Sequence, residues 1–155
     1  MPVFDDFTKS KSIIIECFEY LSKNAQVKIY AFVIMKDHIH VVWQIDQLNA
    51  VNRITSRFKA HTGKMVITYL RSVDPDYVLR HFKSDRQDRI HKFWKINSGC
   101  LELKHSSIIK QKIKYTHLNP TVGLYKVVDD PNEYHYSSSN SYSKLTSEFS
   151  FLNFY

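Results

Sequence analysis

Long hydrophobic runs are missing from this sequence of 155 residues. None approaches the roughly 20 apolar residues that a membrane-spanning helix needs, and the first residues lack the basic region and apolar block of a secretory signal. Cysteine is scarce as well, because Cys17 and Cys100 stand alone, without the paired spacing of a disulfide framework or a zinc site. These absences exclude a membrane protein and a disulfide-rich secreted protein. They predict a soluble, cytoplasmic chain whose two thiols are reduced and structural.

Positive charge and aromatic side chains are plentiful by contrast. Lys and Arg number 22 against 15 acidic residues, a formal net charge of +7, and there are 10 Tyr, 10 Phe and 2 Trp. Basic side chains track a phosphate backbone and aromatic faces accept unpaired bases, so this balance favours single-stranded DNA as a partner. The length fits one domain over residues 1–155, with no repeat or linker and with an irregular tail from about residue 144.

The hydrophobic pattern predicts an α+β domain with helices packed on an antiparallel sheet. A helix is expected over residues 12–24, followed by a strand over 27–34 and a second strand ending at about residue 44. A long helix follows over 48–70, which Gly63 would bend or interrupt. The remaining expected elements are a partly helical stretch over 74–88, short strands or a hairpin over 93–96 and 99–103, and a helix that ends before Pro120.

Two histidines spaced by one apolar residue stand in the second strand, in the run Asp37-His38-Ile39-His40. Side chains alternate along a strand, so His38 and His40 point to the same face, where two neutral imidazoles can bind one cation. Asp37 would face away from that cation on an ideal strand. The alternative is that both histidines are half-exposed polar residues on a sheet face.

The helix before Pro120 carries a tyrosine and an amide on one face. Ser106 and Ser107 indicate a capped start, and Tyr115 and Asn119 are four residues apart, so both address one point. Pro120 disfavours helical geometry at Asn119 and places that amide at the last turn. A phenol attacks only where a cation or a base stabilises its anion. The alternative is that Tyr115 packs in the core and that Asn119 merely ends the helix.

Taken together, His38-Ile39-His40 and the downstream Tyr115-Thr116-His117-Leu118-Asn119-Pro120 resemble the single-tyrosine HUH transposases, in their IS200-like and REP-associated branch. Several further features stand in the same order: Phe93-Trp94 leading into Leu101-Glu102-Leu103, then Thr121-Val122-Gly123-Leu124, and Glu133-Tyr134-His135-Tyr136-Ser137-Ser138. The resemblance covers roughly residues 13–143, and the combination is far more specific than either motif alone.

The resemblance implies a ferredoxin-like sheet and a metal-dependent transposase that acts on single-stranded DNA with hairpin structure. His38, His40 and the amide oxygen of Asn119 would hold Mg²⁺ or Mn²⁺, and Tyr115 would attack the phosphorus to form a 5′-phosphotyrosine adduct. The free 3′-hydroxyl would then permit rejoining without ATP. Related proteins occur as monomers and as dimers, so a homodimer is one expected state.

Weaker expectations concern DNA contacts and the start of the chain. Arg53, Arg57, Lys59 and Lys64 would line a DNA path or form a solvated helix face, Lys112 and Lys114 would neutralise phosphate, and His117 would have a structural or DNA-contact role. Family members begin with a strand before the first helix, whereas Met1-Pro2-Val3-Phe4 stands at what would be the far end of that strand. We therefore expect a misplaced start or a truncated copy whose sheet lacks its first strand beside the histidine strand.

Two other functions fit the same residues. A decayed or domesticated transposase would bind DNA as a module without turnover and would form no covalent adduct. A metal-dependent hydrolase would use His38 and His40 with water as the nucleophile, and its cleavage would survive loss of the Tyr115 hydroxyl.

Overall fold

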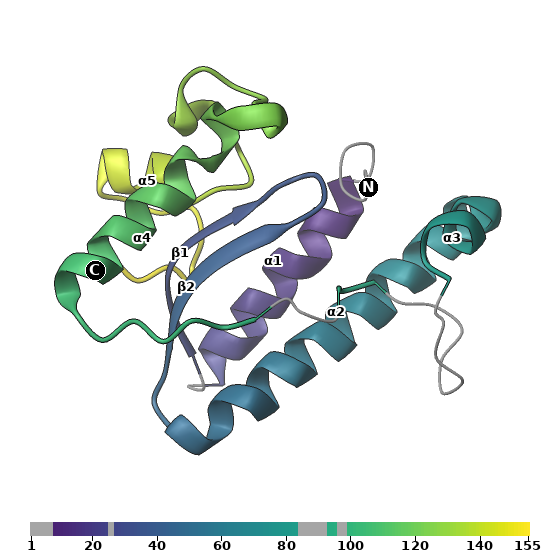
Figure 1. Cartoon of the computed structure of the whole chain (residues 1–155), viewed down its shortest axis with the longest axis horizontal. Helices are drawn as coiled ribbons and strands as arrows, with labels where there is room; N and C mark the ends of the chain where they lie inside the picture. The colour runs from purple at the N-terminus through teal and green to yellow at the C-terminus, as the bar shows by residue number, and fades with distance from the viewer. Residues whose placement is uncertain (1–7, 25–26, 84–92, 96–98) are drawn as a thin grey trace.

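The computed structural model describes residues 8–24, 27–83, 93–95 and 99–155, which form an antiparallel sheet with helices on both faces (Figure 1). This confirms the α+β fold class. The elements are α1 (Thr8–Lys23), β1 (Val27–Ile34), β2 (Ile39–Ile45), α2 (Val51–Val73), α3 (Pro75–His81), α4 (Ser106–Leu118) and α5 (Ser139–Lys144). Short 3₁₀ turns lie at Leu48–Ala50, Asn119–Thr121, Gly123–Tyr125 and Pro131–Glu133. None of the described helices is long and apolar enough to cross a membrane.

The two strands divide the protein into two layers. Ile39 and Val41 of β2 pack toward the core that α1 and α2 share, whereas Val42 packs with Ile113 of α4 on the opposite face. Because side chains alternate along a strand, His40 lies on the face that α4 covers. The face that carries the histidines is therefore the one on which the tyrosine helix lies.

The larger core lies between the sheet and the first two helices. Ile14, Phe18 and Leu21 recur at helical spacing on α1, and all three are buried. The Phe18 ring stacks on Phe58 of α2 with centroids 5.5 Å apart and meets Phe32 of β1 at 5.7 Å. This packing fixes the sheet as a rigid support for the histidine strand.

Gly63 does not bend or interrupt the long helix, contrary to expectation, because α2 runs continuously through it. The glycine is buried, and a Cβ at this position would lie 3.3 Å from the Cβ of Phe93. The neighbouring Trp94 donates from Nε1 to Thr62 Oγ1 at 3.0 Å. The missing side chain thus permits close packing of the 93–94 segment on α2.

The strands expected at 93–96 and 99–103 are absent from the described part of these segments, where residues 93–95 and 99–103 join no ladder. Residues 96–98 and 84–88 lie outside the described chain, and α3 accounts for the helix expected within 74–88. Phe93 packs against the main core and Leu103 against the α4 cluster. Side-chain packing on helices therefore holds these segments in place of the expected backbone hydrogen bonds of a sheet.

The C-terminal segment covers the outer edge of β1. Isolated bridges join Val33 to Ser137 and Ile29 to Leu152. The backbone hydrogen bonds from Ile34 N to Tyr136 O, from Ser138 N to Phe32 O and from Asn153 N to Ile29 O measure 2.9, 3.0 and 2.8 Å. No strand was expected in this segment, yet it closes one side of the sheet.

The outer edge of β2 is different. Phe32 and Ile34 turn backbone groups away from β2, so Val41 and Ile39, which stand opposite them, turn theirs away from β1. No backbone group of the described residues pairs with Ile39 or Val41 along this edge. The histidine strand is thus an edge strand within the described chain, and residues 1–4, on which the expectation about a first strand rests, lie outside that part.

Candidate active site

A tight hairpin sets His38 directly before β2 and His40 within it. Met35 N donates to His38 O at 2.8 Å, so only Lys36 and Asp37 form the loop between the strands. The rings of His38 and His40 lie edge to face with centroids 5.2 Å apart. Both imidazoles stand on the α4 side of the sheet, the shared face that their spacing predicts.

Helix α4 brings the tyrosine and the amide to the same place. Its N-cap is His105, without a side-chain cap bond, so the expected serine cap is wrong, and the helix begins at Ser106 itself. Asn119 keeps α-helical angles (φ −51°, ψ −42°) despite Pro120 and leads directly into the following 3₁₀ turn. The proline therefore tightens the helix end without turning the Asn119 backbone away, and the residue is buried.

Residues some 80 positions apart in the chain meet here. The Asn119 Oδ1 atom lies 3.1 Å from His38 Nε2, and the Tyr115 ring lies edge to face with His40 at 5.5 Å between centroids. Tyr115 is 54% exposed, so its hydroxyl-bearing ring stands at the surface beside the two imidazoles. The four residues that the sequence singled out for chemistry thus form one cluster.

The surroundings of His40 favour its neutral form. Burial lowers the pKa of His40, and the charges of His38 and Lys112 act in the same direction. The Lys112 Nζ atom also lies 5.5 Å from the centre of the Tyr115 ring. A neutral imidazole presents a lone pair to a cation, while the lysine supplies positive charge beside the phenol.

The donor set fits a divalent cation with octahedral preferences. Within the described chain no three His, Cys, Asp or Glu residues form a metal-binding group, so the candidate ligands are two imidazoles and one amide oxygen. Neighbouring ligands on an octahedral ion with bonds of about 2.1 Å lie about 3.0 Å apart. The 3.1 Å between His38 Nε2 and Asn119 Oδ1 matches that edge. Nitrogen and oxygen donors together suit Mn²⁺ at least as well as Mg²⁺.

Asp37 does not face away from the site, contrary to the expectation for an ideal strand. Its Oδ1 atom lies 2.6 Å from His38 Nδ1. Strand alternation does not hold here, because Asp37 belongs to the hairpin loop and β2 begins only at Ile39. Only Lys36 and Asp37 connect the paired strands. A hairpin this tight was the signal that could have revealed the contact between Asp37 and His38.

His117 turns toward the protein. Its Nε2 atom lies 2.8 Å from Ser138 Oγ, and its ring packs edge to face on Tyr142 at 4.9 Å. Burial lowers the pKa of His117 to about 4. Neither Ser138 nor Tyr142 was expected near the tyrosine helix, since no spacing or motif in the sequence links these two residues to His117.

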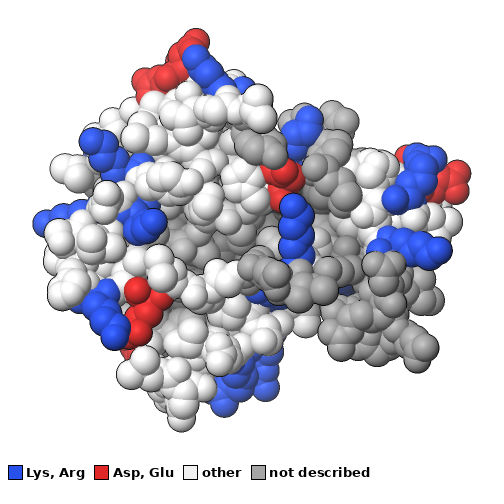
Figure 2. Space-filling view, viewed as in Figure 1, with Lys and Arg blue, Asp and Glu red and all other residues white. Residues whose placement is uncertain are grey.

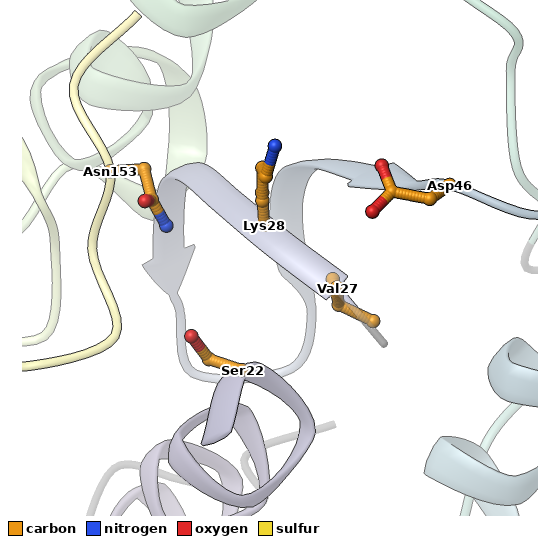
Figure 3. A pocket seen from close by; sticks show the side chains of 5 residues that line it. All are labelled: Ser22, Val27, Lys28, Asp46 and Asn153. Atoms are coloured by element: carbon orange, nitrogen blue, oxygen red, sulfur yellow. The ribbon is translucent and has the colours of Figure 1, made fainter. Parts of the chain in front are cut away.

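The arginines on α2 lie away from this cluster. Arg53 and Arg57 line a pocket of about 390 Å³ at the end of β2 that is remote from the hairpin, and Lys59 follows on the same helix. A neighbouring pocket of about 270 Å³ is lined by Ser22, Val27, Lys28, Asp46 and Asn153 (Figure 3). Figure 2 shows basic side chains spread around the face in view and interrupted by acidic ones. On that face, positive charge is distributed and does not form one continuous stripe.

Comparison with known proteins supplies the family. Neither the search of curated proteins nor that of solved structures found a match. The family described as "Transposase IS200 like" matches residues 3–86, more than half of the chain, and this range includes both histidines but ends before Tyr115. The chain therefore belongs to the IS200-like transposase family, whose members are transposases that process DNA.

Proposed function

We propose that the protein is a metal-dependent transesterase that cleaves and rejoins hairpin-flanked single-stranded DNA through a 5′-phosphotyrosine intermediate. One observation carries this proposal: α4 lays Tyr115 against His40 and Asn119 against His38, with 5.5 Å between ring centroids and 3.1 Å between polar atoms. The nucleophile and the candidate ligands thus lie together where α4 packs on the sheet.

Each residue of the cluster would have a separate role in the cleavage of the phosphodiester. His38, His40 and Asn119 would hold Mg²⁺ or Mn²⁺, which when bound polarises the scissile phosphate and stabilises charge on the leaving oxygen. The Tyr115 oxygen attacks phosphorus and loses its proton to solvent. The bond from phosphorus to the 3′ oxygen breaks, and that oxygen takes up a proton. One phosphodiester replaces another, so the reverse step rejoins DNA without an energy source.

Basic side chains near the cluster would neutralise the DNA backbone. Lys112 lies over the Tyr115 ring, and Lys114, which directly precedes Tyr115 on the same helix, is exposed. Arg53, Arg57 and Lys59 would contact DNA farther from the reacting phosphate, because they lie on α2. Each phosphate contact contributes mainly salt-dependent affinity and carries no sequence information.

A second copy of the chain would pair along the outer edge of β2, which no described strand covers. That edge offers the backbone groups of Ile39 and Val41, and an unpaired edge invites strand addition. An antiparallel β2 to β2 contact would join two sheets and bring two histidine pairs close together.

A DNA-binding module without turnover is the second candidate function. It is favoured by the extent of the family match, which ends at residue 86 and so does not reach the tyrosine. This candidate predicts hairpin binding that is equal in the wild type and in Tyr115→Phe, with no adduct in either.

The decisive experiment compares wild type with Tyr115→Phe on labelled single-stranded hairpin DNA from the flanks of the gene, with Mn²⁺ or with EDTA, on denaturing gels. We expect a slowly migrating adduct only with wild type and Mn²⁺, and nearly unchanged binding by the variant, since a single hydroxyl is lost. Cleavage that survives Tyr115→Phe would instead establish a hydrolase. Binding without any adduct would establish the binding module.

A further inference from the structure

The carboxylate of Asp37 is placed where it can select the proton position on a candidate metal ligand. It comes from the two-residue loop that Met35 and His38 close, and its side chain is 17% exposed against 31% for His38. Its Oδ1 atom lies 2.6 Å from His38 Nδ1, the length of a strong charge-assisted hydrogen bond.

The two nitrogens of His38 compete for one proton. A neutral imidazole carries its hydrogen on one nitrogen only, and each nitrogen of His38 faces an oxygen: Asp37 Oδ1 at 2.6 Å and Asn119 Oδ1 at 3.1 Å. Hydrogen bonds to an ionised acceptor are roughly twice as strong as those to a neutral one, and this one is also the shorter. The hydrogen bond to the carboxylate is therefore the stronger of the two, so the hydrogen resides on Nδ1.

We propose that Asp37 is a positioning residue that holds His38 in the Nδ1–H form, so that the Nε2 lone pair is directed at the point it shares with Asn119. The significance of this arrangement rests on the proposed function, because only a cation at that point uses the lone pair. Outer carboxylates of this kind typically change metal affinity about 10–100-fold.

The two histidines differ in whether a carboxylate bonds to the imidazole ring. His40 has ring neighbours in His38 and Tyr115, and none of the carboxylates in the described chain bonds to it. His40 is held by ring packing, whereas His38 is oriented by a specific acceptor. Loss of Asp37 therefore affects one ligand and leaves the other in place.

Long-range ¹H–¹⁵N NMR of the metal-free protein at pH 8 tests the assignment directly, because the ring-nitrogen shifts report the proton position. The His38 signals are identified by their loss in His38→Gln. We expect the Nδ1–H form in wild type and in Asp37→Asn, whose amide oxygen still accepts. In Asp37→Ala we expect a shift toward the Nε2–H form, since Asn119 Oδ1 still lies 3.1 Å from Nε2 while the carboxylate at Nδ1 is gone.

Manganese binding, followed by electron paramagnetic resonance, provides the second measurement. Asp37→Ala should weaken Mn²⁺ binding by about 10-fold or more and Asp37→Asn by less than about 3-fold. Asp46→Asn is the matched control, because Asp46 accepts from Gln44 at 3.0 Å at the far end of β2 and should leave both measurements unchanged.

The possible failures are distinguishable. An Nε2–H form in wild type overturns the role of Asp37, and this measurement needs no variant to fold. Equal loss of Mn²⁺ affinity in Asp37→Ala and Asp46→Asn also overturns it, because the effect would then be general. If wild type shows the Nδ1–H form but binds no Mn²⁺, the proposed metal chemistry fails while the assignment of the proton stands.

Discussion

His117 couples the protonation of one side chain to the stability of the fold. Its pKa is lowered to about 4 by burial, whereas an imidazole in the unfolded chain titrates near 6.5. Between those values the unfolded chain binds a proton that the folded chain does not. The stabilising effect is complete above about pH 6.5 and is lost as the pH falls toward 4.

We therefore expect His117→Gln to reduce the dependence of stability on pH in this window. Urea unfolding midpoints measured from pH 7 to pH 4.5 should fall less steeply for the variant than for wild type. The exposed His135 provides the control, and His135→Gln should keep the wild-type slope. Equal slopes for wild type and His117→Gln would show that the imidazole is accessible to protons in the folded state.

The two cysteines should react very differently. Burial raises the pKa of the Cys17 thiol to about 11, while Cys100 is exposed. Because the thiolate is the reactive form, a thiol reagent at pH 8 should modify one thiol per folded chain quickly and the second only in denaturant. Cys100→Ser should abolish the fast phase. A fast phase that persists in this variant would contradict the burial of Cys17.

Among the elements, α4 has the largest influence on the candidate site, because it supplies both Tyr115 and Asn119. The helix is attached to the sheet through a small cluster in which Ile113 packs with Ala31 and Val42. Few apolar contacts therefore hold the nucleophile in place.

Ile113→Ala should loosen this attachment. We expect a loss of about 2–4 kcal/mol in the free energy of unfolding, as for other buried isoleucines, and a loss of cleavage larger than the fraction of unfolded protein explains. Ile108→Ala on the same helix is the control, because Ile108 is 39% exposed. Urea denaturation and the gel assay give both quantities. If both variants lower cleavage equally, the cluster does not position the helix.

Elements with a strong local period were predictable from the sequence, and those defined by long-range contacts were not. The strand at Val27–Ile34 and the long helix follow directly from their apolar patterns. The segments at 93–95 and 99–103 resemble strands locally but pack on helices, a choice that only the tertiary contacts decide. The same holds for the site: the facing of His38 and His40 follows from strand alternation, whereas the contact of Asp37 depends on a hairpin geometry outside any periodic element.

For the molecule as a whole, the C-terminal segment is part of the core. Tyr134 and Tyr136 receive Lys11 Nζ over their rings at 5.8 and 4.6 Å, and Phe149 and Phe151 are buried against the sheet and α1. The alternation of Phe149, Ser150 and Phe151 was a period-two signal in a segment too short to stand out. The C-terminal segment thus pairs with β1 and adds two aromatic side chains to the larger core.

Phe151→Ala tests this integration. Phe151 is 3% exposed and its ring meets Phe18 at 5.8 Å and Phe32 at 5.6 Å, so it joins α1, β1 and the C-terminal segment. We expect a loss of about 3–5 kcal/mol in the free energy of unfolding, because the cavity lies in the centre of the larger core. Phe154→Ala is the matched control, since Phe154 is 43% exposed, and should cost less than about 1 kcal/mol. Comparable losses in the two variants would mean that the segment does not pack into the core. A large difference in urea denaturation would instead show that the segment bridged to the edge of β1 at Leu152 also packs into the larger core through Phe151.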